Sequence, residues 1–139
     1  MVFIPAAGWI TIFFLFLALL NFVLKQVSRD YVKNLPREYK DFADAYRRFM
    51  QHIIRRHRYF GIAAVVFFLF HAGLILFFSV GISFTGLVTG FILLAVVSLG
   101  AYGYFVNKDF RSWWVPMHRG CAFALMVSAM VHVFYKLYI

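Results

Sequence analysis

Four histidines stand at positions where they could bind a redox-active metal group. The segments from His57 to His71 and from His118 to His132 each begin with His-Arg, end in His fourteen positions later, and are otherwise almost wholly apolar. On an α-helix, fourteen residues turn through about 1400°, which is about 40° short of four full turns. The two members of each pair therefore share one helix face, about 21 Å apart along the axis. This spacing predicts two ligand sites, one above the other.

The composition predicts that the helices bearing these histidines cross a membrane. Of the 139 residues, 64% are hydrophobic and 14% are charged, and the mean hydropathy is +0.82. A soluble domain of this length could not bury so much apolar surface. The net charge of +9 lies almost entirely in two hydrophilic stretches, so it indicates membrane topology and not nucleic-acid binding. The lone Cys121 excludes an internal disulfide and a thiolate zinc or iron–sulfur site.

We expect an all-α membrane protein with one domain, residues 1–139, built as a bundle of four transmembrane helices. Each predicted span has about 20 residues, which matches a hydrocarbon core of about 30 Å; the spans lie at about residues 4–24, 59–80, 84–106 and 115–135. The first segment has no charged leader and no small-residue cleavage site, so we expect it to be a retained helix and not a signal peptide.

The long polar region between the first two spans predicts one further helix, at about residues 36–56. Asn34 and Pro36 are typical of a helix start, with Asn as the cap and Pro in the first turn. Apolar residues then recur at helical spacing, namely Tyr39, Phe42, Ala43, Tyr46, Phe49, Met50 and Ile53. The pattern predicts a cytoplasmic amphipathic helix that runs on into the second span and contacts either membrane lipid, the favoured reading, or a partner.

The distribution of basic residues predicts the orientation. The loops after the first and third spans hold thirteen of the fourteen Lys and Arg residues when Arg119 is included, and Lys136 is the remaining one. Both loops should therefore be cytoplasmic and both termini outside, in what we expect to be the cytoplasmic membrane of a prokaryote. The second and fourth spans then run parallel, with His57 and His118 at the cytoplasmic end and the other two histidines nearer the outer face.

The number of ligands indicates which group binds. Zinc normally takes four protein ligands, and no Asp or Glu lies within a span to complete such a site. A haem already supplies four equatorial nitrogens and leaves two axial positions, for which imidazole is well suited. We therefore predict two b-type haems, one ligated by His57 and His118 and the other by His71 and His132.

Residues near the ligands could shape these sites. The face of the second span between its histidines carries Gly61, Ala64 and Phe68, and the matching face of the fourth span carries Ala122, Leu125 and Ala129. Four of these six are Gly or Ala, which leaves room for a flat macrocycle, and the two larger side chains would fill the remaining space. We expect each imidazole to donate its second ring N–H to a backbone carbonyl or a hydroxyl. Arg58 and Arg119 either pair with haem propionates or only obey the positive-inside rule.

Two motifs resemble the ferric reductase-like transmembrane domain. They are H-R-x-x-G followed by a His, at His57, Arg58, Gly61 and His71, and W-x-x-x-H-R followed by a His, at Trp114, His118, Arg119 and His132. That superfamily includes ferric reductases, NADPH oxidases and the haem subunit of bacterial methionine sulfoxide reductase systems. The resemblance implies a haem-binding core with two His on each of two helices, and it covers the second to fourth spans. This chain has four predicted spans where the family usually has six. The cytochrome b of quinol-oxidising complexes is similar too.

Together these observations predict transmembrane electron transfer by a dihaem b-type cytochrome. It would link a cytoplasmic or quinol donor to an acceptor on the outer face. No residue is placed as a nucleophile or general acid, so the chain would be an electron-transfer component of an oxidoreductase, with a flavoprotein, a quinol or another redox protein as partner. Two alternatives stay open. One is a haem-bearing anchor subunit of a larger oxidoreductase complex. The other, a haem-free transporter with His proton relays, is disfavoured because no carboxylate lies in a span.

Overall fold

The computed structural model describes residues 3–138, and this part of the chain is helical apart from short connections. The four long helices are α1 (Phe3–Asp30), α2 (Lys40–Phe77), α3 (Phe84–Phe105) and α4 (Trp114–Tyr138). All four are long and apolar enough to cross a membrane, which confirms the expected all-α class and the number of candidate spans. Contacts divide the chain into two compact units, Met1–His71 and Ala72–Ile139, called the first and second unit below.

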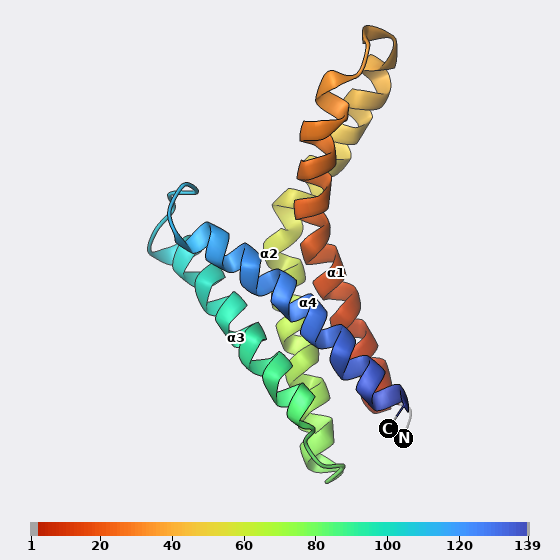
Figure 1. The fold of residues 1–139 in the computed structure, drawn as a ribbon, viewed down its shortest axis with the longest axis vertical. Helices are drawn as coiled ribbons and strands as arrows, with labels where there is room; N and C mark the ends of the chain where they lie inside the picture. The colour runs from red at the N-terminus through yellow and green to blue at the C-terminus, as the bar shows by residue number, and fades with distance from the viewer. Residues whose placement is uncertain (1–2, 139) are drawn as a thin grey trace. The chain divides into compact units, whose positions relative to one another are not determined.

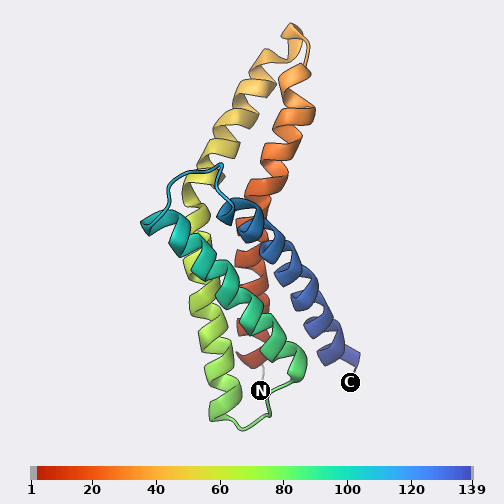
Figure 2. The same ribbon diagram turned by 60° about the vertical axis from the view of Figure 1, so that its left-hand side comes forward.

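The first unit is a long antiparallel hairpin of α1 and α2 (Figures 1 and 2). With 28 and 38 residues, these helices are about 42 and about 57 Å long, more than the 30 Å or so of a hydrocarbon core. Both helices continue past their predicted spans at the same end, α1 to Asp30 and α2 from Lys40. The rings of Phe14 and Phe67 stack 5.5 Å apart between the two helices. The hairpin therefore has a membrane-length part and a polar extension.

The polar extension has its own contacts between the helices. The phenol of Tyr46 donates a hydrogen bond to the Leu24 carbonyl over 2.8 Å, and burial raises the pKa of Tyr46. Leu24, Val32 and Ala43 are buried. The apolar residues of the predicted amphipathic helix therefore do not all face the same way. Ala43 and Ile53 are buried, whereas Tyr39, Phe42 and Phe49 are exposed. The helix does run on into the second span without a break, as expected; its contact with lipid stays a prediction.

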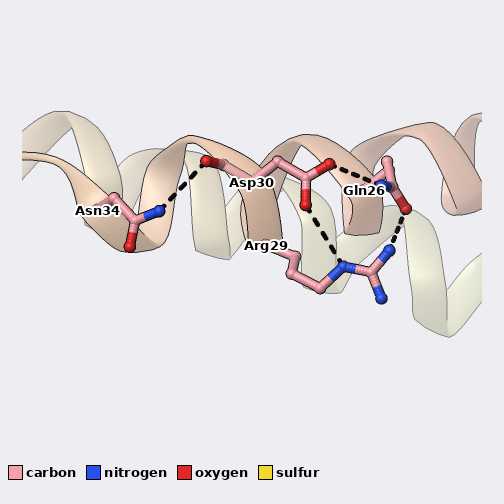
Figure 3. A network of polar contacts seen from close by, with 4 residues as sticks. All are labelled: Gln26, Arg29, Asp30 and Asn34. Atoms are coloured by element: carbon pink, nitrogen blue, oxygen red, sulfur yellow. Dashed lines mark hydrogen bonds and ion pairs between the residues drawn. The ribbon is translucent and has the colours of Figure 1, made fainter.

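The predicted start of this helix is wrong by about four residues. The Asn34 side chain does not cap the following helix. It donates to the backbone carbonyl of Asp30 over 3.3 Å and so terminates α1 (Figure 3). Gln26 and Arg29 complete this network, with the Gln26 amide 2.6 Å and the Arg29 Nε 3.5 Å from the Asp30 carboxylate. Pro36 precedes a single 3₁₀ turn, Arg37–Tyr39, and the α-helix begins at Lys40.

A tight turn leads from α2 to α3. Ser79 and Gly81 have positive φ angles of 50° and 85°, and the Val80 N–H bonds back to the Ile75 carbonyl over 3.1 Å. This is the pattern in which a left-handed residue ends a helix and satisfies its last carbonyls. Ser83 then caps α3, its hydroxyl accepting from the Gly86 N–H. α2 thus ends at Phe77, three residues before the expected end of the second span, and α3 begins at Phe84 as expected.

In the second unit, α3 and α4 pack along their length (Figure 2). The Thr89 and Ser128 hydroxyls meet at 2.7 Å across this interface. At one end the Trp114 ring lies against Gly103, where a Cβ would come within 2.3 Å of the indole. Gly103 therefore allows a close approach between the two helices.

Candidate functional site

Both candidate ligand histidines of the first unit, His57 and His71, point at the backbone of α1. The Nδ1 atom of His57 donates to the Ala18 carbonyl over 3.1 Å, and that of His71 donates to the Ile4 carbonyl over 2.9 Å. The prediction that the two imidazoles share one face of α2 is confirmed. Because a carbonyl oxygen can only accept, the proton at each bond belongs to Nδ1.

The matched spacing of ligands and acceptors follows from the antiparallel register. His71 follows His57 by fourteen residues, and Ile4 precedes Ala18 by fourteen. Two antiparallel helices that keep one register bring such positions to the same level, since each residue of either helix advances by about 1.5 Å. The same alignment of α1 against α2 therefore places a carbonyl acceptor opposite both His57 and His71.

The second unit repeats this arrangement with one change. His118 donates from Nδ1 to the Val96 carbonyl of α3 over 3.0 Å. The carbonyl fourteen residues before Val96 is that of Ile82, which precedes the first residue of α3. In its place two hydroxyls lie at the Nδ1 atom of His132, Thr85 Oγ1 at 3.0 Å and Ser83 Oγ at 3.4 Å. All four imidazoles thus have a partner on the preceding helix.

Glycines make room for three of the four imidazoles. A Cβ at Gly8 would lie 3.2 Å from Cε1 of His71, one at Gly86 would lie 3.2 Å from Cε1 of His132, and one at Gly100 would lie 3.3 Å from Cε1 of His118. Gly8 follows Ile4 by four residues and Gly100 follows Val96 by four. The His71 and His118 rings therefore rest on the backbone one helical turn beyond their acceptors, and the His132 ring rests on Gly86, next to Thr85; a side chain at any of these glycines would push the ring away.

This arrangement suits metal ligation through Nε2. Histidine ligands typically donate their other ring N–H to a carbonyl or a carboxylate, which fixes the tautomer and the ring plane. Within residues 3–138, no three His, Cys, Asp or Glu side chains gather as a site for a bare metal ion would require. A porphyrin brings its other ligands itself, so an imidazole held in this way could serve as its axial ligand.

Trp114 contributes to the site in a way that the sequence interpretation missed. Its ring meets the His118 ring edge-on, with centroids 6.4 Å apart, and the side chain is buried. Aromatic residues near the end of a membrane span are typically interfacial, and sequence alone favours that role for Trp113 and Trp114. The spacing of Trp114, four residues before His118, was the available signal, because residues four apart are neighbours on a helix. Trp113 is exposed, as a belt residue would be, and contacts Tyr102.

The remaining predicted residues lie on the helices as follows. Ala64, Leu125 and Ala129 are buried, whereas Gly61, Phe68 and Ala122 are partly exposed. Arg58 and Arg119 are exposed, and the Arg58 guanidinium lies 5.1 Å from the Tyr59 ring centre and donates to its hydroxyl. The contacts of all these residues with a haem stay predictions. So does the pairing of His57 with His118 and of His71 with His132, because each pair joins the two units.

Compared with known proteins, the chain matches no family model, and neither a curated relative nor a solved structure is similar to it.

Proposed function

We propose that this chain is an integral-membrane cytochrome that carries two b-type haems and passes single electrons across the bilayer. His57 and His118 would be the axial ligands of one haem, and His71 and His132 those of the other. The observation that supports this most is the hydrogen bonding of all four imidazoles through Nδ1 to the preceding helix, by carbonyls at matched register in the first unit and by one carbonyl and a hydroxyl pair in the second. The bound haems would supply one-electron iron chemistry, and the protein would fix their position and surroundings.

The same hydrogen bonds argue against the transporter alternative. A histidine proton relay takes a proton on one ring nitrogen and releases it from the other. A carbonyl partner offers no proton and holds one at Nδ1, and three of the four histidines have such a partner. No Asp or Glu lies among the spans to continue a relay. Ligation through Nε2 uses the tautomer with the proton on Nδ1. A proton relay would have to move that proton and so break the hydrogen bond to the carbonyl.

The polar end of the first unit supports a further reading, the anchor subunit of a larger oxidoreductase complex. The helices there extend beyond membrane length, and the exposed rings of Tyr39, Phe42 and Phe49 lie among basic residues. With both basic loops cytoplasmic, a flavoprotein or a quinol-oxidising partner would meet this surface. Copurification of a stoichiometric soluble subunit, lost in a Phe42→Asp, Phe49→Asp double variant, would favour the anchor form over the free-standing cytochrome.

The proposal is tested by the visible spectrum and the haem content of the purified chain. We expect a sharp Soret band, a reduced α-band of six-coordinate haem b and two haems per chain by pyridine-haemochrome assay. His71→Ala and His132→Ala should each remove the same haem, and His57→Ala and His118→Ala should each remove the other. A preparation that stays colourless after haem supply refutes the proposal. Equal loss of both haems in every variant refutes the pairing.

His52 offers a matched control on the same helix. It precedes His57 by five residues, so it lies on another face of α2, and its ring contacts the Arg56 guanidinium instead of α1. His52→Ala should therefore retain both haems. Loss of haem from this variant as well would show that the histidine substitutions act through folding.

A further inference from the structure

His132 is anchored differently from the other three histidines, by side chains instead of a main-chain carbonyl. The cause is the start of α3 at Phe84, which leaves no helical carbonyl at the level of this ring. The Thr85 and Ser83 hydroxyls occupy that level, 3.0 and 3.4 Å from Nδ1. Here alone, among the four anchors, a substitution can change the chemistry of the acceptor.

The hydroxyls form a short chain of hydrogen bonds with a defined direction. Ser83 Oγ accepts from the Gly86 N–H over 3.2 Å as the cap of α3, and it also accepts from the Thr85 hydroxyl over 3.4 Å. The Thr85 proton is thereby directed at Ser83, and its oxygen lone pairs remain to accept from the imidazole. An imidazole that ligates iron through Nε2 carries its proton on Nδ1, so as a ligand His132 would donate to the Thr85 hydroxyl, in the same tautomer that the carbonyls impose elsewhere.

The acceptor at Nδ1 controls how strongly Nε2 donates to a metal. A stronger acceptor draws the Nδ1 proton away from the ring, makes the ligand more basic and stabilises the ferric state, which lowers the reduction potential. Loss of the acceptor has the opposite effect. A neutral hydroxyl lies between these extremes, with a carboxylate at the strong end and a methyl group at the weak end.

We propose that the Ser83–Thr85 hydroxyl pair sets the reduction potential of the haem that His132 ligates, separately from the haem of His118. Thr85 acts through the imidazole, so it is a positioning residue and not a ligand. The inference rests on the proposed function, because it concerns the same haem site, but it adds the residues that tune that site.

The test is a spectroscopic redox titration of the full chain with two haems bound. The potential to follow is that of the haem missing in His132→Ala. Thr85→Val and Thr85→Ala should raise it, Thr85→Asp should lower it, and Thr85→Ser should leave it near the starting value. The α-band and the low-spin electron paramagnetic resonance signal should persist in the valine variant, which shows that His132 remains a ligand.

Thr89→Val is the matched control, one turn further along α3. The Thr89 hydroxyl donates to the Thr85 carbonyl over 2.8 Å and meets Ser128, but no histidine. Neither haem potential should move in this variant. Unchanged potentials in the Thr85 series, or equal shifts of both haems, overturn the tuning role while leaving the cytochrome proposal intact. A colourless wild-type chain overturns the cytochrome proposal and the tuning role together.

Discussion

The Nδ1 atom of His71 lies 2.9 Å from the carbonyl oxygen of Ile4, a residue 67 positions earlier in the chain. This bond joins the first turn of α1 to the last third of α2, and the bond from His57 to Ala18 repeats it at the other level. The helix before each histidine pair is thus part of the site, although it contributes no predicted ligand.

The glycine beneath His71 provides a test of this anchoring. Gly8→Val places a branched side chain where a Cβ alone would lie 3.2 Å from the imidazole, so the ring must move off its acceptor. Loss of such a supporting contact typically costs about tenfold or more in metal affinity. We expect haem to be lost from the His71 site during washing with apomyoglobin. Gly73→Val is the control, since a Cβ there meets no atom within 4 Å; equal haem loss from both variants would contradict the anchoring role.

Gly103 is expected to be intolerant of any side chain. A Cβ at this position would lie 2.3 Å from the buried Trp114 ring, and overpacking of this kind costs about 1–3 kcal/mol. Gly103→Ala should therefore lower the midpoint of thermal unfolding in detergent, followed by circular dichroism. Gly120→Ala on α4 has open space around its Cβ and should not lower it. Similar midpoints for the two variants would rule out the tight contact.

Tyr46 should hold the polar ends of α1 and α2 together. Tyr46→Phe removes the hydrogen bond to Leu24, worth about 1 kcal/mol, and about a fivefold gain in local opening follows. Trypsin cleavage at Lys33 and Arg37 should become faster by that factor, whereas Tyr39→Phe, on an exposed ring, should leave the rate unchanged.

The titration of Tyr46 predicts a pH dependence for the same contact. Burial raises the folded-state pKa of its phenol above the unfolded value of about 10. The neutral phenol therefore stabilises the hairpin fully below about pH 10, and this contribution is lost as the pH rises through the folded pKa. Local opening of residues 31–39, between α1 and α2, can be measured by hydrogen exchange corrected for the intrinsic rate. It should increase in this pH range in the wild type and stay constant in Tyr46→Phe.

Cysteine labelling checks the orientation. In a Cys121→Ala background, Lys33→Cys lies in an exposed basic connection and Ile82→Cys in the exposed turn before α3. The positive-inside rule predicts that an impermeant maleimide labels Ile82→Cys in intact cells and Lys33→Cys only after permeabilisation. The reverse result would invert the proposed topology.

The helices and the shared faces of the histidines were predictable because both follow from local periodicity. Apolar runs of about 20 residues define the spans, and fourteen residues come close to four turns. The type of partner at Nδ1 was predictable from the chemistry of histidine ligands. Its identity was not, because it depends on the register between two helices that are far apart in sequence.

The errors have the same origin. Asn34 is of a residue type that often caps the start of a helix. Its side chain instead bonds to the helix before it, because the Asp30 carbonyl lies within hydrogen-bonding distance. Trp114 is of a residue type that is common at the membrane interface. Its ring instead packs against α3, because Gly103 has no side chain to occupy that space. In both cases a tertiary contact decided between two locally acceptable roles.

One consequence of the continuous α2 helix concerns mechanics. No proline interrupts this helix from Lys40 to Phe77. Its basic end and the segment that carries both imidazoles should therefore rotate as one rigid body. Torque applied to the arginine-rich end by a docked protein would rotate His57 and His71 together against the carbonyls that hold them.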